Sequence, residues 1–137
     1  MSTSKETSTI RVLYVEPAKM PEVIEIEHTL ETLQSLVGGY IQVLYPWEDE
    51  VAVICDDEGK IKGSPLNRAL ENDRGEVYDV IAGNFIVAGL TEDSFGSLPD
   101  AYIAKYCEKF CAPEVFLATS ENRLIMLRDG QNPHVIA

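Results

Sequence analysis

Asn67 and Arg68 are the side chains of this sequence best suited to recognising another molecule. They stand side by side in SPLNRAL, residues 64–70, where the neighbouring residues are small or apolar. A guanidinium presents a planar fork of N–H donors that matches a carboxylate. Arg68 could therefore bind a carboxylate of a ligand or partner, with Asn67 beside it. The alternative is that both lie on the exposed side of a short helix, with Arg68 paired to Glu71 or Asp79.

The acidic triplet Asp56-Asp57-Glu58 has the carboxylate oxygens that a hard cation prefers. A calcium loop counted from Asp56 would, however, place Lys60 at a ligand position and Lys62 where a ligand carbonyl is needed. The triplet is therefore predicted to be a solvated turn.

The thiols and imidazoles are too few and too scattered for a zinc site. Cys107 and Cys111 are four residues apart, and zinc would need two further ligands. The two histidines of the chain are His28 and His134, far from the cysteines in sequence. We therefore expect Cys107 and Cys111 to be buried thiols and the protein to bind no metal.

The sequence lacks the patterns of common enzymes. Tyr40 and Ile41 follow Gly38-Gly39, where a Walker loop needs a lysine and a hydroxyl. A nucleophile needs a base and an orienting group, and two histidines supply few bases. Carboxylate pairs are expected by chance among 23 acidic residues. The expectation is a protein without a cofactor that is not an enzyme.

The charge balance argues against several classes of partner. Asp and Glu total 23 against 11 Lys and Arg, a formal net charge of −12, and the cations are scattered. Because nucleic-acid binding relies on clustered cations, we expect no direct binding to DNA, RNA or an anionic membrane. No apolar run reaches the about 18 residues of a membrane span. Three cysteines and an N-terminus unlike a secretory signal predict a cytoplasmic protein.

Hydrophobic periodicity predicts one α+β domain, because its strands and helices do not alternate regularly. The expected sheet is mostly antiparallel or mixed, with two longer helices and one short helix. The short helix is predicted at residues 64–70, because Ser64-Pro65 is a helix-start signal. The longer helices are expected at residues 29–37 and 97–110, and strands at 10–15, 23–26, 40–45, 51–55 and 76–89.

Two segments leave alternatives open. Gly83-Asn84 is either a hairpin turn or a bulge in one strand over residues 76–89, and the bulge is favoured because the hairpin arms would be short. After Pro113, two apolar arms flank Ser120-Glu121-Asn122, which indicates a terminal hairpin or else a helix.

Five motifs occur in a fixed order: RVLYVEP, LVGGYIQVLYP, VAVICDDEGK, PLNRAL and YDVIAGNFIVAG. Together they resemble a bacterial and phage family catalogued as domain of unknown function 3846. The resemblance implies a protein of phages, plasmids and integrative elements, with no known activity to carry over. It also implies that the family's pattern includes Gly38, Gly39, Tyr40, Pro65, Asn67, Arg68 and Gly83. We therefore expect a disordered tail at residues 1–9, the family-like domain at 10–111 and a C-terminal extension at 112–137.

The predicted function is that of a small, non-enzymatic, cytoplasmic interaction module of a mobile element. Its partner would be a protein or a small ligand, bound by a face that includes Tyr40, Trp47, Asn67 and Arg68. Trp47 either caps the core or is an exposed aromatic anchor for the partner.

Two other functions remain open from the sequence. An acidic DNA mimic that blocks a host defence nuclease would need rows of carboxylates, and Glu48-Asp49-Glu50 and Asp56-Asp57-Glu58 are compatible with such rows. A small enzyme of unknown chemistry would need polar groups that converge in a cleft.

Overall fold

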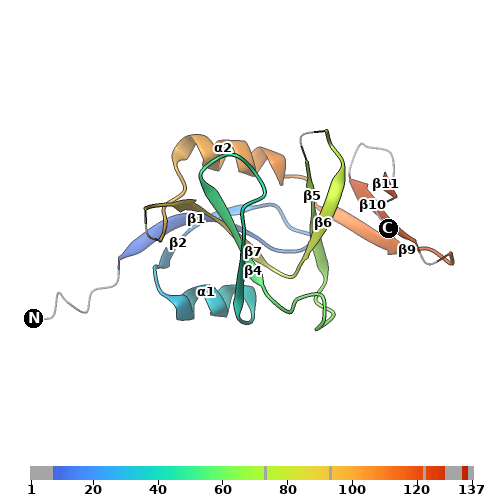
Figure 1. Cartoon of the computed structure of the whole chain (residues 1–137), viewed down its shortest axis with the longest axis horizontal. Helices are drawn as coiled ribbons and strands as arrows, with labels where there is room; N and C mark the ends of the chain where they lie inside the picture. The colour runs from blue at the N-terminus through green and yellow to red at the C-terminus, as the bar shows by residue number, and fades with distance from the viewer. Residues whose placement is uncertain (1–7, 73, 93, 122, 129–133, 136–137) are drawn as a thin grey trace, which may run out of the picture.

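A six-stranded antiparallel sheet forms the centre of the fold (Figure 1). The computed structural model describes residues 8–72, 74–92, 94–121, 123–128 and 134–135. The main sheet has the order β2-β1-β7-β4-β3, and β8 pairs with β7. Its strands are β1 (Thr9–Val15), β2 (Glu22–Glu27), β3 (Ile41–Leu44), β4 (Val51–Asp56), β7 (Phe85–Leu90) and β8 (Phe95–Gly96). This antiparallel sheet with separate helices confirms the α+β prediction, while residues 1–7 of the predicted tail lie outside the described residues.

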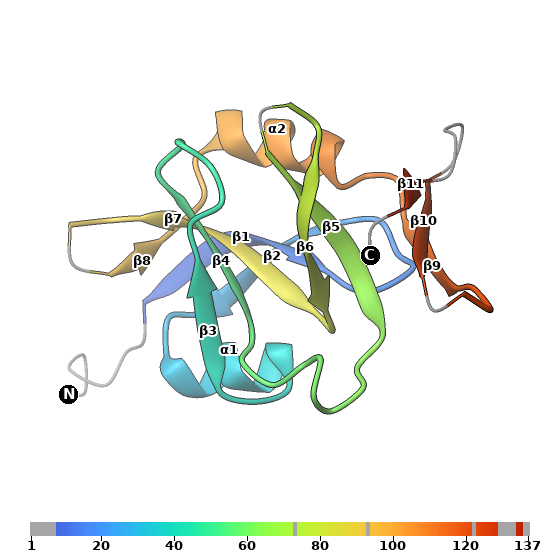
Figure 2. The ribbon, with the colours of Figure 1, turned by 45° about the vertical axis from the view of Figure 1, so that its right-hand side comes forward.

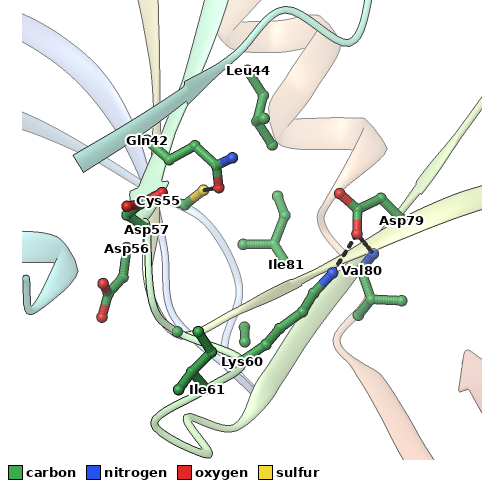
Figure 3. A pocket seen from close by; sticks show the side chains of 12 residues that line it. Gln42, Leu44, Cys55, Asp56, Asp57, Lys60, Ile61, Asp79, Val80 and Ile81 are labelled. Atoms are coloured by element: carbon green, nitrogen blue, oxygen red, sulfur yellow. Dashed lines mark hydrogen bonds and ion pairs between the residues drawn. The ribbon is translucent and has the colours of Figure 1, made fainter. Parts of the chain in front are cut away.

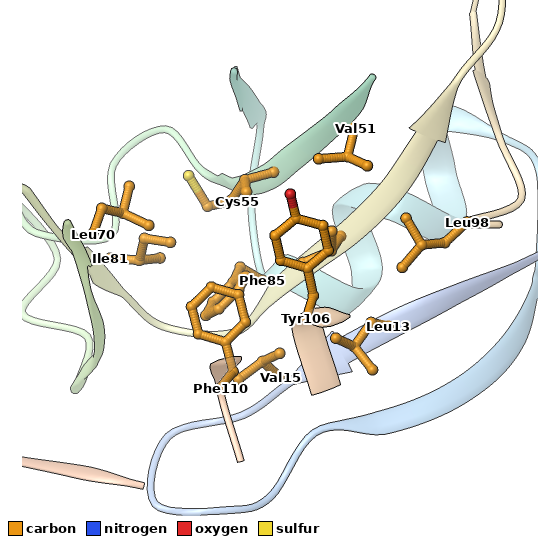
Figure 4. Close-up of a cluster of buried hydrophobic side chains, with 12 residues drawn as sticks. Leu13, Val15, Val51, Cys55, Leu70, Ile81, Phe85, Leu98, Tyr106 and Phe110 are labelled. Atoms are coloured by element: carbon orange, nitrogen blue, oxygen red, sulfur yellow. The ribbon is translucent and has the colours of Figure 1, made fainter. Parts of the chain in front are cut away.

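Two helices cover the two faces of the main sheet (Figure 1). On one face, α1 (Leu30–Val37) buries Leu33 and Val37 against the sheet. On the other face, α2 (Asp100–Lys109) buries Tyr106, and Phe110 follows it into the same core (Figure 4). Because β4 is covered on both faces, its side chains form one continuous apolar run up to Cys55.

The ends of α1 have the geometry that its sequence predicts. Thr29 is the N-cap, and its Oγ1 accepts a hydrogen bond from the Thr32 N–H at 3.1 Å. Gly38 ends the helix with a φ of 90°, a backbone conformation that costs glycine little.

The short helix predicted at residues 64–70 is wrong. Residues Leu66–Glu71 form strand β5, which pairs antiparallel with β6 (Val77–Ala82) in a two-stranded sheet. Successive residues of β5 are buried on opposite sides of the strand. Leu70 enters the main core, and Ala69 enters another cluster with Met126. Burial on both sides suits an extended chain, and this tertiary packing overrides the helix-start signal. The described residues therefore contain two helices instead of the three predicted.

Gly83 and Asn84 form neither a hairpin turn nor a bulge, so the favoured single strand over residues 76–89 is wrong. The segment contains two strands, β6 and β7, which belong to different sheets. Gly83 lies between them with a φ of 84°, and its N–H donates to the Pro65 carbonyl at 2.7 Å. The local pattern is equally strand-like on both sides of Gly83, so only the pairing partners distinguish the two strands.

A third, three-stranded sheet lies beside β5 at one end of the molecule (Figure 2). It contains β9 (Glu114–Ala118), β10 (Leu124–Arg128) and β11 (His134–Val135), all antiparallel. Met126 of β10 is fully buried against Ala69 and Val80. The two apolar arms after Pro113 are thus strands, and they pack on the β5–β6 hairpin.

Gly89 and Gly96 are paired across β7 and β8, and they allow a matched test of this packing. A Cβ at Gly89 would lie 2.3 Å from the backbone oxygen of Ser97, whereas one at Gly96 would meet only a Thr91 methyl group. We expect Gly89→Ala to lower the free energy of unfolding by about 2 kcal/mol or more, and Gly96→Ala by about 1 kcal/mol or less. Urea unfolding measures both, and equal losses would contradict the packing at Ser97.

Candidate functional site

Arg68 is fully buried in β5, and its guanidinium donates to the protein's own backbone. Nε and Nη2 donate to the Phe110 carbonyl at 3.2 and 2.8 Å, and Nη2 also donates to the Lys19 carbonyl at 2.6 Å. Nη1 donates to Oδ1 of Asn67 at 2.8 Å. The Phe110 carbonyl belongs to the last turn of α2, where the helix dipole favours a cation. Burial lowers the pKa of Arg68 and the nearby Glu114 raises it, but a guanidinium stays protonated.

Asn67 is also fully buried and donates to two other segments of the backbone. Its Nδ2 lies 3.0 Å from the Val15 carbonyl and 2.8 Å from the Gly83 carbonyl. We refer to Asn67 and Arg68 as the clasp, because together they join β1, the β1–β2 loop, the β6–β7 link and the end of α2. The interpretation that both are exposed on a helix is wrong.

The two acids suggested as partners of Arg68 bind other cations. Asp79 pairs with Lys60 at 2.5 Å, and Glu71 pairs with Arg128 at 2.9 Å.

Trp47 covers the edge of the main core and also lines a surface hollow. Its ring stacks on Tyr106 with centroids 4.5 Å apart and lies 5.9 Å from the Phe110 ring. The indole Nε1 is buried and has no hydrogen-bond partner among the described residues. The ammonium of Lys109 lies 5.8 Å from the centroid of the Trp47 ring, within cation–π range.

Asp49 organises the other side of this hollow. Its Oδ2 accepts from Lys105 Nζ and from the Tyr106 hydroxyl, both at 2.5 Å. The hydrogen bond from Lys105, followed by that from Tyr106, lowers the pKa of Asp49. Burial and the hydrogen bond to Asp49 raise the pKa of Tyr106, so its hydroxyl stays protonated. At neutral pH Asp49 is therefore a carboxylate and Tyr106 is a neutral phenol.

The structure does not bring the four predicted binding residues onto one face. Trp47 and the clasp both meet α2 at Phe110, but the clasp is buried there whereas Trp47 is partly exposed. Tyr40 is 74% exposed and lies before β3, at the opposite end of that strand from Trp47.

Two adjoining hollows lie between β3 and β6, and a third lies at Trp47. The first, about 160 Å³, lies over Gln42, Cys55 and Ile81 (Figure 3). The second, about 210 Å³, shares Leu44 and Asp79 with the first, and it is also lined by Tyr45, Pro46, Leu70 and Tyr78. The third, about 440 Å³, shares no lining residue with the other two; it is lined by Trp47 and Glu71, the neighbours in sequence of Pro46 and Leu70 in the second. We refer to the three together as the groove.

Sequence reasoning missed the two tyrosines of the groove, Tyr45 and Tyr78. They are 63% and 54% exposed, although aromatic side chains in strand-like runs are ordinarily expected to pack inward. Tyr78 stands between Val77 and Asp79 in a run of mixed polarity. An aromatic residue at a position of a strand that faces solvent is a signal that could have identified it as a binding residue.

Sequence reasoning also missed Glu114 and Arg128, which attach the third sheet to β5. Glu114 is buried; its Oε1 accepts from the Ala69 N–H at 2.7 Å, and its Oε2 accepts from Arg128 at 2.6 Å. Glu114 and Arg128 are opposite each other across β9 and β10. In the sequence, Glu114 and Arg128 lie equally far from the turn predicted at Ser120-Glu121-Asn122. Opposite charges placed in this way could have predicted a cross-strand pair.

Cys55 is the thiol that faces the groove, and its surroundings disfavour the thiolate form. Burial, followed by the negative charges of Asp79 and Asp56, raises its pKa to about 11. Among the described residues, no cluster of three His, Cys, Asp or Glu side chains is placed to hold a metal ion. In the same part of the chain, neither α1 nor α2 has the length and apolar composition to span a bilayer.

Comparison with known proteins identifies a family for most of the chain. The family described as Domain of unknown function (DUF3846) matches residues 10–111, which confirms the resemblance seen in the five motifs. The match ends before β9, so the third sheet lies beyond it. No curated protein and no solved structure matches the chain.

Replacing Arg68 tests the clasp. We expect Arg68→Ala to lower the free energy of unfolding by about 3 kcal/mol or more, because it leaves the carbonyl of the buried Phe110 and that of Lys19 without their guanidinium donors. Arg123→Ala is the matched control, since the Arg123 side chain is exposed, and we expect a change of about 0.5 kcal/mol or less. Urea unfolding compares the two variants, and losses of equal size would contradict the role of the clasp.

The environment of Cys55 predicts an order of thiol reactivity. Cys107 is partly buried and Cys111 is exposed, so the expectation that both are buried thiols is wrong. In the folded protein near neutral pH, iodoacetamide should modify the exposed Cys111 first and leave Cys55 intact, because a raised pKa leaves little thiolate. Mass spectrometry of peptides over time measures the order, with urea-unfolded protein as the control. Modification of Cys55 as fast as Cys111 in the folded protein would contradict this environment.

Proposed function

We propose that this chain, which belongs to the family described as Domain of unknown function (DUF3846), is a non-enzymatic module that binds a polypeptide segment in the groove. The observation that carries this proposal is the row of aromatic side chains along the groove. Tyr45 and Tyr78 are more than half exposed on the second hollow, and Trp47 lines the third. Aromatic side chains of this kind dominate binding energy at protein interfaces.

The shape of the groove favours a polypeptide over a compact small molecule. The three hollows follow one another along β3 and the loop after it, so the lining changes from Gln42 through Leu44 to Trp47. An extended chain can occupy all three hollows at once, whereas a compact ligand occupies one.

The chemistry of the groove supports binding rather than catalysis. A catalytic base or nucleophile needs a pKa matched to its task. Cys55 is held as a thiol, Tyr106 as a phenol and Asp49 as a hydrogen-bonded carboxylate. Each of these pKa values is therefore shifted away from neutral pH, where a catalytic acid, base or nucleophile would need it. For this reason the enzyme hypothesis ranks below binding.

The predicted binding residues take different roles in this proposal. Trp47 contacts the bound segment, and Tyr40 can extend the contact beyond the far end of β3. Asn67 and Arg68 support the groove from inside, because they hold β5 and the end of α2 in place. The cytoplasmic setting predicted from the sequence and the mobile-element origin that the resemblance implies are compatible with such a module.

The DNA-mimic hypothesis has less support from the geometry. The two acidic triplets lie at opposite ends of β4, and one carboxylate in each is paired inside the molecule. Asp49 pairs with Lys105, and Asp56 is buried and pairs with Lys62 at 2.7 Å. Each ion pair neutralises one carboxylate of a triplet, whereas a DNA mimic needs continuous rows of unpaired carboxylates.

A displayed library of random peptides tests the proposed function. Peptides enriched on the wild-type protein should bind a Tyr45→Ala/Tyr78→Ala variant about tenfold more weakly or worse, because two aromatic contacts are lost. Val115→Ala/Leu117→Ala is the matched control, since these side chains are similarly exposed but lie on β9 outside the groove. Fluorescence anisotropy with synthetic peptides measures each affinity. No enrichment, or equal binding by both double variants, would overturn the proposal.

A further inference from the structure

The two outer strands of the main sheet differ in how they are protected. On one side, β2 carries Glu22, Glu25 and Glu27, all exposed. Charged side chains on an edge strand discourage the addition of another strand. On the other side, β3 has the sequence Ile41-Gln42-Val43-Leu44 and carries no charge. The edge that borders the groove is therefore the one without this protection.

The backbone of β3 has groups free to pair with another strand. The Asp57 N–H donates to the Tyr40 carbonyl at 2.8 Å, and hydrogen-bonded pairs alternate along an antiparallel ladder. The backbone N–H and C=O groups of Gln42 and Leu44 therefore point toward β4. Those of Ile41 and Val43 point toward the open edge. In the described part of the chain, no hydrogen bond from another segment reaches the backbone of Ile41 or Val43.

Across the groove, β6 is less able to accept a strand. The Val80 N–H donates to Oδ1 of Asp79 at 2.8 Å, and the same oxygen accepts from Lys60 Nζ at 2.5 Å (Figure 3). The side chains of β6 nevertheless supply a wall opposite β3. A strand added to β3 would direct every second side chain toward this wall.

The charges at the ends of β3 indicate the composition of the added strand. Glu48 and Glu50 lie beyond one end of β3, and Asp57 and Glu58 lie beside the other. All four carboxylates are exposed, and none forms an ion pair with another described residue. Cationic residues at both ends of an incoming segment would complement them.

The same charges disfavour a second copy of this chain as the occupant. A two-fold antiparallel pairing of β3 with itself would place Glu48 and Glu50 of one copy beside Asp57 and Glu58 of the other. Like charges placed opposite each other in a sheet are destabilising.

We propose that β3 accepts an extended basic segment of another protein, which adds as a strand to the edge of the main sheet. This inference rests on the proposed function and names the chemistry of the bound segment. The segment has Lys or Arg at both ends and apolar or β-branched residues at alternate positions between them. Its backbone pairs with Ile41 and Val43, and its side chains on one face enter the groove.

A labelled synthetic peptide with Lys-Arg at both ends of an alternating Val-Thr core tests the charge requirement. We expect saturable binding in fluorescence anisotropy, and binding about tenfold weaker or worse when the ends are Glu-Glu. Glu48→Lys/Glu50→Lys should reverse part of this preference, with circular dichroism as the control for folding. Equal affinity for the basic and acidic peptides would overturn the inference.

Two N-methylated forms of the basic peptide test the strand pairing. One form carries N-methyl groups at alternate residues, and the other carries them one residue further along. Because only one edge of the added strand faces β3, one form should lose binding and the other should keep it. Equal binding by both forms and the parent peptide would overturn strand addition.

Binding to the groove can hold even if the basic strand does not. Library peptides that depend on Tyr45 and Tyr78 but lack basic ends would leave the groove as the binding site and overturn the basic strand. A concentration-dependent dimer that Val43→Pro abolishes would overturn the inference in favour of a second copy, since proline removes an N–H from the open edge.

Discussion

The buried guanidinium of Arg68 is the interaction on which the arrangement of the other elements depends. A buried cation is costly unless its donors are satisfied, and Arg68 satisfies them with the carbonyls of Lys19 and Phe110 and the side chain of Asn67. The two carbonyls come from segments far from Arg68 in the sequence. The requirement to satisfy one fork of donors therefore sets the positions of the β1–β2 loop, β5 and the end of α2 together.

The groove is a consequence of this arrangement. The clasp holds the β5–β6 hairpin next to α2, on the face of the main sheet that α2 covers. The hairpin consequently lies opposite β3 instead of pairing with it, and the space between them is the groove. The ion pair of Arg128 with Glu71 and Glu114 supports the hairpin from its other side. Buried residues outside the groove thus determine where the groove lies.

Much of the fold could be predicted from the sequence, because it depends on local signals. The apolar spacing and the cap at Thr29 specify α1, the spacing of Tyr106 and Phe110 specifies α2, and strand pairs close in sequence form β1–β2 and β3–β4. Of the candidate site, Trp47 was identified as an aromatic at the core edge or surface, and the structure shows that it contributes to both. Tyr45 and Tyr78 were missed because exposure of an aromatic in a strand depends on what packs against it.

The sequence by itself determined the acidic charge, the α+β class and the family that matches residues 10–111, and it singled out Asn67 and Arg68. Only the tertiary structure decided that these two residues are buried in a strand, that Gly83 connects two sheets and that β3 has an open edge. The physical reason is the range of the interactions. Helix caps and apolar periodicity act within a few residues, whereas the carbonyls that satisfy Arg68 come from Lys19 and Phe110, 49 and 42 residues away along the chain.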